Sequence, residues 1–279
     1  MERFDPGFDC GSSVGLDEGG QKGGSKNFFS GIPWFDSLLP SGMPVPSSIV
    51  VSGPSGTGKP FVGLALAGSW LRQGGRVIFI PVHSSYLGLF ERGLQQILCG
   101  ASLREYSDSH FFILLDTDLD PREESVEVAG GNAIRCNFLN PMVWREALEV
   151  ASASMEGEGP ILIFNCALNL LLMSPTYGED FFLMLLDTIR EPGSWTYLFA
   201  ASSSILLKKI VVLEQGADHL FVMKGVPEDH QVYLRAARVR DAGFYNATVS
   251  VLGMPEFVGE LKAEAVASRR ILIPKVSRV

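Results

Sequence analysis

Residues 48–60 read SIVVSGPSGTGKP and predict both a local structure and a ligand. The β-branched run 48–52 predicts a buried strand, and the apolar pattern of 61–73 predicts a helix. A glycine-rich turn between a strand and a helix is the setting in which a loop binds phosphate. The residues that we assign to nucleotide binding are Gly53, Pro54, Ser55, Gly56, Thr57, Gly58, Lys59 and Pro60.

The physical basis of this assignment is the backbone of the loop. Glycines let consecutive N–H groups turn inward toward phosphate oxygens, and the amino end of the following helix adds partial positive charge. In the pattern G-x-x-x-x-G-K-[S/T], the side chain of Lys59 would reach the β- and γ-phosphates of a nucleotide. Every position of that pattern is met except the last.

Pro60 is the departure from the pattern. The residue after the lysine normally gives a hydroxyl to Mg²⁺, and proline has none. Proline also lacks a backbone N–H and disfavours the helical conformation of the residue before it, here Lys59. Because proline is accepted in the first turn of a helix, we expect the loss to fall on phosphate and metal binding and to spare the fold.

Outward from the loop, short apolar runs alternate with helical segments. This alternation predicts an α/β fold with a mostly parallel sheet covered by helices on both faces. The predicted helices are 61–73, 86–99, 141–155 and 179–190. The predicted strands are 48–52, 76–82, 111–115, 161–164, 196–201, 219–223 and 231–238.

Composition narrows the class of protein. The chain has 279 residues, of which 46% are hydrophobic, and a formal net charge of −8, which disfavours a surface built wholly for nucleic acid. The four cysteines contain no CxxC pair, so they suggest neither a zinc site nor a disulfide framework. With no secretory signal pattern and no apolar stretch long enough to span a bilayer, we expect a cytoplasmic protein without a membrane partner.

The two ends of the sequence differ in composition from the middle. Residues 1–26 are rich in glycine and serine and predict a flexible tail, for which ordering on a partner is the alternative. Residues 27–259 read as one nucleotide-binding domain. Residues 260–279 are basic and read as a solvated tail or, alternatively, as a docking segment.

Three segments carry a resemblance to RecA-like ATPases of the KaiC and RadA type. Residues 29–44, FSGIPWFDSLLPSGMP, resemble the segment that leads into the phosphate loop of that family. Residues 214–221, EQGADHLF, resemble one of its later strands, and 238–241, RVRD, resemble a turn that helps to read the nucleotide of a neighbouring subunit.

This resemblance covers residues 28–251 and implies a RecA-like core that assembles into a ring or filament with ATP or ADP at subunit boundaries. By the same resemblance, Arg238 and Arg240 would sense a nucleotide between subunits. The expected partner is a second copy of this chain or a related active subunit.

The sequence departs from the family where the family carries its catalytic groups. The strand 161–165, ILIFN, ends in Asn165 where the family has an aspartate that supports Mg²⁺, and an amide is a poor partner for a hard dication. His83 stands where the family has its catalytic glutamate. The resemblance therefore implies no intact catalytic residue, no metal site, and ATP or ADP bound with little help from Mg²⁺.

Two alternatives stay open at this point. The strand 111–115 also ends in an acid, Asp116, followed by Asp118 and Asp120, although the order of elements favours 161–165 as the metal-supporting strand. Ser202, Ser203 and Ser204 follow a strand at the sheet edge where ligands bind in α/β folds. They predict either a sensor of the γ-phosphate or simply the beginning of a loop.

We therefore expect a pseudo-ATPase that binds ATP or ADP weakly or not at all and acts through assembly. The second hypothesis is a slow ATPase that takes metal and base from a neighbouring subunit. The third is a DNA-binding recombination module, which the net charge of −8 disfavours.

Overall fold

A computed structural model describes most of the chain. The described residues are 26–81, 86–98, 100–119, 126–129, 131–166, 168–226 and 231–251, with the single positions 259, 263, 267, 270, 273 and 276. The predicted tail 1–26 therefore lies outside them except for its last residue, and His83 and Asp120 lie outside them as well.

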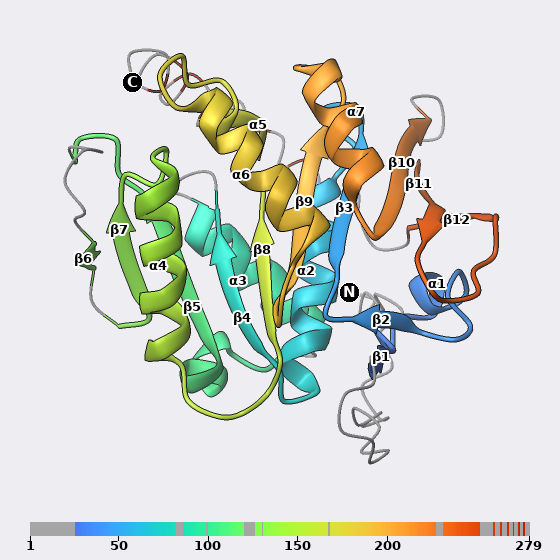
Figure 1. The fold of residues 1–279 in the computed structure, drawn as a ribbon. Coiled ribbons are helices and arrows are strands. Elements are labelled where there is room, and N and C mark those ends of the chain that lie inside the picture. The colour runs from blue at the N-terminus through green and yellow to red at the C-terminus, as the bar shows by residue number, and fades with distance from the viewer. Residues whose placement is uncertain are drawn as a thin grey trace.

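A ten-stranded sheet forms the centre of the molecule, in the order β12-β11-β10-β3-β9-β8-β4-β5-β7-β6 (Figure 1). Neighbouring strands from β10 to β7 run parallel, whereas β11, β12 and β6 add antiparallel edges. The strands are β3 (Ser48–Gly53), β4 (Arg76–Ile80), β5 (His110–Leu115), β6 (Glu127–Val128), β7 (Ala133–Cys136), β8 (Ile161–Asn165), β9 (Thr196–Ser202), β10 (His219–Val226), β11 (Gln231–Val239) and β12 (Thr248–Ser250).

Helices cover both faces of this sheet. Figure 1 shows α4, α6 and α7 in front of it and α2 and α3 behind. A small second sheet pairs β1 (Lys26–Phe28) with β2 (Met43–Val45). The helices are α1 (Pro33–Asp36), α2 (Lys59–Arg72), α3 (Tyr86–Ile97), the 3-10 helix η1 (Leu103–Ser109), α4 (Pro141–Ser154), α5 (Leu168–Leu171), α6 (Gly178–Arg190) and α7 (Leu207–Gly216).

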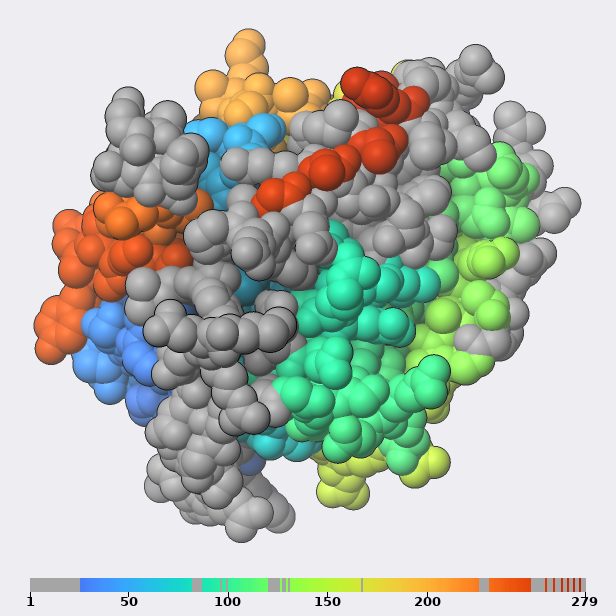
Figure 2. Space-filling model, turned by 180° about the vertical axis from the view of Figure 1, so that it is seen from behind, coloured from blue at the N-terminus to red at the C-terminus, as the bar shows by residue number. Residues whose placement is uncertain are grey.

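The core lies in two apolar layers, one on each face. Along β3 the side chains alternate between them, since Ile49 and Val51 join the layer under α2 and α3 while Val50 joins the layer under α4, α6 and α7. Parallel strands buried on both faces need continuous apolar runs, which is why these strands were readable in the sequence. The face that carries α2 and α3 is the one seen in Figure 2.

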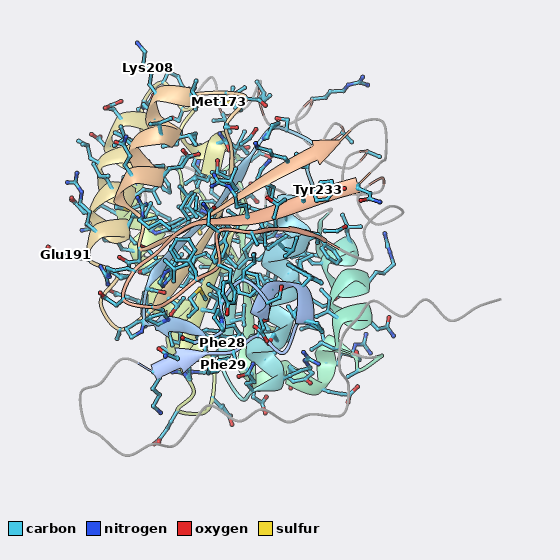
Figure 3. All side chains as sticks on the ribbon, turned by 90° about the vertical axis from the view of Figure 1, so that its right-hand side faces the viewer. Phe28, Phe29, Met173, Glu191, Lys208 and Tyr233 are labelled. Atoms are coloured by element: carbon cyan, nitrogen blue, oxygen red, sulfur yellow. The ribbon has the colours of Figure 1, made fainter. Side chains whose placement is uncertain are left out.

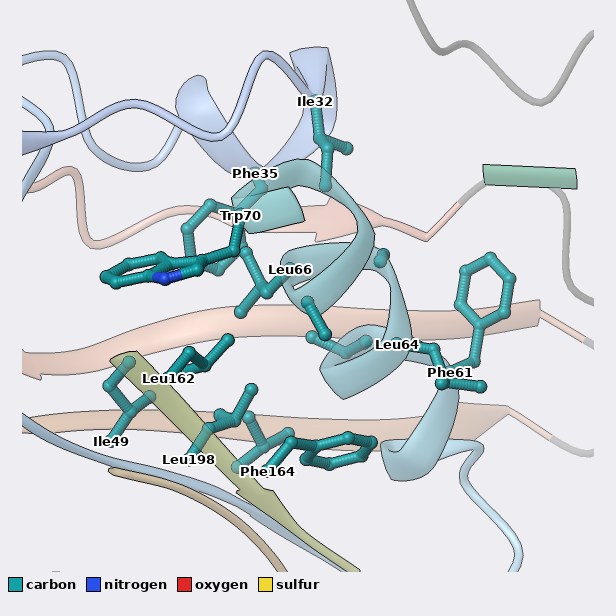
Figure 4. Packing of buried hydrophobic residues seen from close by; sticks show 14 of the residues in the cluster. Ile32, Phe35, Ile49, Phe61, Leu64, Leu66, Trp70, Leu162, Phe164 and Leu198 are labelled. Carbon is teal, nitrogen blue, oxygen red and sulfur yellow. The ribbon is translucent and has the colours of Figure 1, made fainter. Parts of the chain in front are cut away.

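Helix α2 is buried along most of its length. Figure 4 shows Phe61, Leu64, Leu66 and Trp70 above the sheet residues that they cover. A Cβ on Gly63 would lie 2.2 Å from the ring of Phe164, so the absence of a side chain there lets the helix approach β8 closely. The helix that follows the glycine loop is thereby fixed against the strand that ends in Asn165.

Parallel strands give the sheet two chemically distinct edges. We call the edge formed by the carboxyl ends, at Gly53, Asn165 and Ser202, the loop edge, and the edge formed by the amino ends, at Ser48 and His219, the opposite edge. In Figure 3, Lys208 and Met173 mark the side of the loop edge, and Phe28 and Phe29 lie at the other end of the molecule.

For the segment 260–279 the sequence suggested a solvated tail or a docking segment, and two of its few described positions belong to the core. Val276 is fully buried, and Ile273 packs against the same apolar layer as α4 and α6. Among the described residues, none of the helices combines the length and apolar character that a membrane crossing requires.

Candidate functional site

The glycine loop joins β3 to α2 at the loop edge of the sheet. Gly56 and Gly58 have φ angles of 82° and 73°, which side chains disfavour, and a Cβ on Gly53 would lie 2.5 Å from the carbonyl oxygen of Met223. Residues 54–56 form the exposed tip of the loop. The glycine-rich turn between a strand and a helix is therefore present, and phosphate binding there stays a prediction.

The side chain of Lys59 lies inside the loop. It is 6% exposed, and its ammonium donates hydrogen bonds to the carbonyl oxygens of Gly53 at 3.0 Å and Pro54 at 2.6 Å. Thr57 Oγ1 lies 3.3 Å from the same Nζ and donates its own hydroxyl to the carbonyl of Pro54 at 2.9 Å. The positive charge of the loop is thus held by the loop's own oxygens.

Pro60 occupies the first turn of α2. The helix begins at Lys59, with Gly58 as its left-handed N-cap, so the restriction that we expected Pro60 to place on Lys59 does not delay the helix. The N–H of Phe61 donates to the carbonyl of Gly58 at 2.9 Å and closes the turn. What Pro60 removes is a backbone donor and a side-chain hydroxyl, while the fold is kept.

Four serines join the loop to the end of β9, three of them through their side chains. The N–H of Ser55 donates to Ser204 Oγ at 2.9 Å, and the hydroxyls of Ser55 and Ser202 lie 2.8 Å apart. The N–H of Ser203 donates to the carbonyl of Gly53 at 3.0 Å. We call Ser55, Ser202 and Ser204 the serine latch. Their side chains take up the N–H and the hydroxyl of Ser55, which belongs to the exposed tip of the loop.

A residue that sequence reasoning missed holds this latch in place. Asn169 Oδ1 accepts the N–H of Ser202 at 2.6 Å, and its Nδ2 donates to the carbonyl of Ser202 at 2.9 Å. The side chain therefore pairs with the end of β9 as a neighbouring strand would. The only signal in the sequence was a polar residue inside the apolar stretch 161–173.

Asn165 ends β8, and one strand, β9, lies between β8 and the loop strand β3. Its side chain is fully buried and carries no charge. Asp116 follows β5, four strands from β3, which at about 4.8 Å per strand is about 19 Å away. Its carboxylate instead accepts the N–H of Asp118 at 3.0 Å, so the 116–118 acids form a local turn away from the glycine loop.

The groups needed to hold a metal ion are not gathered in the described part of the chain. No cluster of three or more histidine, cysteine, aspartate or glutamate side chains occurs among those residues. Burial raises the pKa of Cys136 to about 12, which keeps its thiol protonated and makes it a poor ligand. The predicted position His83 lies outside the described residues.

Arg238 and Arg240 lie at the opposite edge of the sheet. Arg238 pairs with Leu220 in the β10–β11 ladder and donates from Nη2 to the carbonyl of Glu214. Arg240 forms an ion pair with Asp218, its Nη1 lying 2.5 Å from Oδ1. The structure therefore does not bring either arginine to the glycine loop of its own chain.

Comparison of the sequence with protein-family models and with curated proteins finds no match. Comparison with solved structures does find matches. The crystal structure of a KaiC-like protein from the hyperthermophilic archaeon Pyrococcus horikoshii OT3 matches 81% of this chain and 94% of its own, with a TM-score of 0.55 and 15% sequence identity.

The fold is RecA-like. At 15% identity the match establishes the architecture and leaves the chemistry to be argued from the residues of this chain. In the sheet, one strand separates β3 from the strand that ends in Asn165, and three separate it from the strand that ends at Leu115.

Proposed function

We propose that this chain is a RecA-like pseudo-ATPase. It would bind ATP or ADP weakly or not at all and act through assembly with itself or with a related active subunit. The observation that carries the proposal is the loop itself, whose backbone turns favour an anion, while Pro60 and Asn165 stand where the resemblance leads us to expect the two groups that support Mg²⁺.

Phosphate fits the described loop, and Mg²⁺ does not. The turns at Gly56 and Gly58 and the amino end of α2 favour an anion, with Lys59 close by as the counter-charge. A phosphate would have to take hydrogen bonds that Lys59 now gives to Gly53 and Pro54 and that Ser55 gives to Ser204. This competition within the chain supports weak binding.

The catalytic deficit supports negligible turnover. Pro60 has no hydroxyl for a metal, and the amide of Asn165 has no negative charge to hold the metal's water shell. Each ~1.4 kcal/mol added to a barrier slows a reaction tenfold, so losing both supports would lower the rate by several orders of magnitude.

Assembly is proposed from the place of Arg238 and Arg240. Because they lie at the opposite edge, a nucleotide that they contacted would belong to a neighbouring subunit. Their bonds to Glu214 and Asp218 would orient them from within the chain. A ring or filament of identical or related subunits would bring the two edges together.

Calorimetric titration with ATP and ADP, with and without Mg²⁺, tests the proposal. We expect dissociation constants on the order of 0.1 mM or weaker that change little with Mg²⁺. Lys59→Met, which keeps an unbranched side chain one atom shorter and removes its charge, is the matched control for binding through the loop. Mg²⁺-dependent ATP cleavage that this variant abolishes would overturn the pseudo-ATPase in favour of the slow enzyme.

Light scattering of the purified chain, alone and with nucleotide, tests assembly. A monomer under both conditions would leave the proposal dependent on a related partner subunit. Tight, salt-sensitive binding to single-stranded DNA would instead favour the recombination module.

A further inference from the structure

The side chain of Asn169 takes the place of a neighbouring strand beside the end of β9. The last residue pair between β8 and β9 joins Asn165 to Phe199, and Ser202 lies beyond that pair. Asn169 accepts the N–H of Ser202 at 2.6 Å and donates to its carbonyl at 2.9 Å. Both backbone groups of Ser202 are therefore held by one side chain.

Helix α5 gives Asn169 a fixed position. Its neighbours Leu168, Leu170 and Leu171 are buried and belong to the apolar layer under α4, α6 and α7. Because a close-packed layer resists the displacement of its members, Asn169 cannot follow Ser202 if the end of β9 moves. A movement of Ser202 would instead break both of its hydrogen bonds to Asn169.

The hydroxyl of Ser202 extends this restraint to the glycine loop. It lies 2.8 Å from the hydroxyl of Ser55, and it accepts the N–H of Ser204 at 3.4 Å. Ser204 Oγ in turn accepts the N–H of Ser55 at 2.9 Å. The exposed tip of the loop is thus bonded, through the hydroxyl and the N–H of one residue, to a pair of serines whose position depends on Asn169.

These bonds occupy a group that a ligand of the loop would need. Inward N–H groups are what a glycine-rich loop offers to an anion, and the N–H of Ser55 now donates to Ser204. An anion could accept that N–H only after the bond to Ser204 breaks. The opening is harder when Ser202 and Ser204 cannot move aside, and Asn169 is the residue that prevents Ser202 from doing so.

We propose that Asn169 is a positioning residue that holds the glycine loop closed through the serine latch. The closure is a property of the chain without a ligand. That it excludes phosphate rests on the proposed function, so closure is measured without nucleotide and exclusion is measured with it.

Amide hydrogen exchange of Ser55, followed by NMR without nucleotide, measures closure. Asn169→Ala removes both bonds to Ser202, so the N–H of Ser55 should exchange about tenfold faster than in the original chain. Asn169→Asp keeps the acceptor for the N–H of Ser202 and loses the donor to its carbonyl, so it should give an intermediate rate. Ser204→Ala removes the acceptor itself and sets the rate of the open loop.

Asn132→Ala is the matched control for this measurement. The amide of Asn132 also donates to two backbone carbonyls, those of His110 and Ser107, but at the opposite edge of the sheet. Its loss should leave the exchange of Ser55 within about twofold of the original rate. The proposal is overturned if both Asn169 variants exchange Ser55 at the original rate, or if Asn132→Ala accelerates it as much as Asn169→Ala does.

Calorimetric titration with ATP measures exclusion. Asn169→Ala should raise the affinity about threefold to tenfold, and the gain of the Asn169→Ala, Ser204→Ala double variant should be smaller than the product of the two single gains. Gains that multiply fully would show that Asn169 acts by another route and would overturn the proposal. If the exchange results hold and none of the variants binds ATP, the closure is supported and the proposed function loses its ligand.

Discussion

At the opposite edge of the sheet a buried carboxylate, Asp218, pairs with an arginine, whereas at the loop edge the strands β8 and β9 end in an amide and in hydroxyls. Asp218 Oδ2 also accepts the N–H of Ser48 at 2.9 Å, and its N–H donates to Ser48 Oγ at 3.0 Å. A buried charge with a full set of partners stabilises the chain at the edge that holds no phosphate loop.

The loop edge has the backbone turns of a glycine loop, and the strands β8 and β9 end there without a carboxylate. The backbone at Gly56 and Gly58 and the close packing of α2 on β8 are matters of geometry, which Pro60 and Asn165 do not disturb. The turns and the packing at the loop edge therefore form without a Mg²⁺ ligand at position 60 or 165. We accordingly expect substitutions at the opposite edge to change stability and substitutions at the loop edge to change ligand affinity.

The largest effect is expected from Asp218→Asn. Its carboxylate is 3% exposed and loses a charge-assisted bond to Arg240 as well as strength in its bond to Ser48. Because Arg240 is half exposed and can return to water, we expect a loss of about 2–3 kcal/mol in the free energy of unfolding rather than the larger cost of a fully buried pair. Urea denaturation measures it.

Asp241→Asn is the matched control for that experiment. Asp241 is 78% exposed, lies 3.4 Å from the same arginine, and has a φ of 57° that asparagine tolerates. Its substitution should change the free energy of unfolding by less than about 0.5 kcal/mol. Equal losses in the two variants would contradict the assignment of stability to the buried network.

Pro60→Thr should have the next largest effect, on nucleotide affinity. It returns a backbone donor to the loop and adds a hydroxyl for Mg²⁺, without needing to change Lys59, which is already helical. Affinity for ATP should rise about tenfold or more, because a hydrogen bond to a charged group is worth about 1.5–3 kcal/mol. Turnover should stay low, since Asn165 is unchanged.

Pro60→Ala separates the two contributions to this gain. It restores the N–H alone, so its gain should not depend on Mg²⁺, whereas the additional gain of threonine should. Calorimetric titration of both variants at fixed Mg²⁺ measures the difference. If the original protein already binds with a dissociation constant in the low micromolar range, Pro60 is not what limits phosphate binding.

Lowering the pH should reduce the stability of the folded chain through His219, which lies at the opposite edge. Its Nε2 lies 3.2 Å from the carbonyl of Pro44, to which it donates, while Nδ1 accepts the N–H of Arg240 at 3.3 Å. A protonated ring could not accept that bond, and burial lowers the pKa of His219 below its ordinary 6.5. As pH falls below about 6.5, the unfolded chain takes up a proton that the folded chain refuses, and stability declines.

One such histidine can contribute at most about 1.4 kcal/mol per pH unit. His219→Gln keeps a donor and an acceptor but does not titrate, so it should flatten the dependence of unfolding free energy on pH between 7.5 and 5.5. The pKa of His110 is also lowered, so His110→Gln should remove a separate part of the slope. An unchanged slope in His219→Gln would show that its ring is not held neutral.

Much of the central sheet could be predicted because its strands are continuous apolar runs. The predicted strand 48–52 is found at Ser48–Gly53, and the predicted strand 161–164 is found at Ile161–Asn165. The first pairs with β9, and the second lies between β9 and β4, all in parallel. The missed elements lack such runs. In strand β7 the exposed Arg135 lies between two buried residues, which interrupts the apolar run. Helix α7 begins after Leu206, which has a φ of 53° that no local sequence pattern predicts.

The sequence predicted the position of the glycine loop but not the hydrogen bonds that join it to the end of β9. The pattern around Lys59 is local, so the sequence alone located the glycine loop between its strand and its helix. The bond from Ser55 to Ser204 joins residues 149 positions apart, and the pairing of Asn169 with Ser202 depends on the chain returning to β9. Long-range bonds between neutral polar residues leave no periodicity or motif to read.

Ser204→Ala is expected to have the smallest effect, and its sign decides between two interpretations of the serine latch. Ser204 Oγ now accepts the N–H of Ser55, a group of the loop that a phosphate oxygen could occupy. If the latch competes with phosphate, removing this neutral hydrogen bond should raise ATP affinity about threefold, equivalent to about 0.6 kcal/mol. If Ser204 instead senses the γ-phosphate, affinity for ATP should fall while affinity for ADP stays the same.

Ser203→Ala is the control, because the backbone N–H of Ser203, and not its side chain, bonds to Gly53. Titration of both variants with ATP and ADP measures the two affinities, and a parallel rise for both nucleotides in Ser204→Ala alone would establish that the neutral loop edge holds its own phosphate site closed.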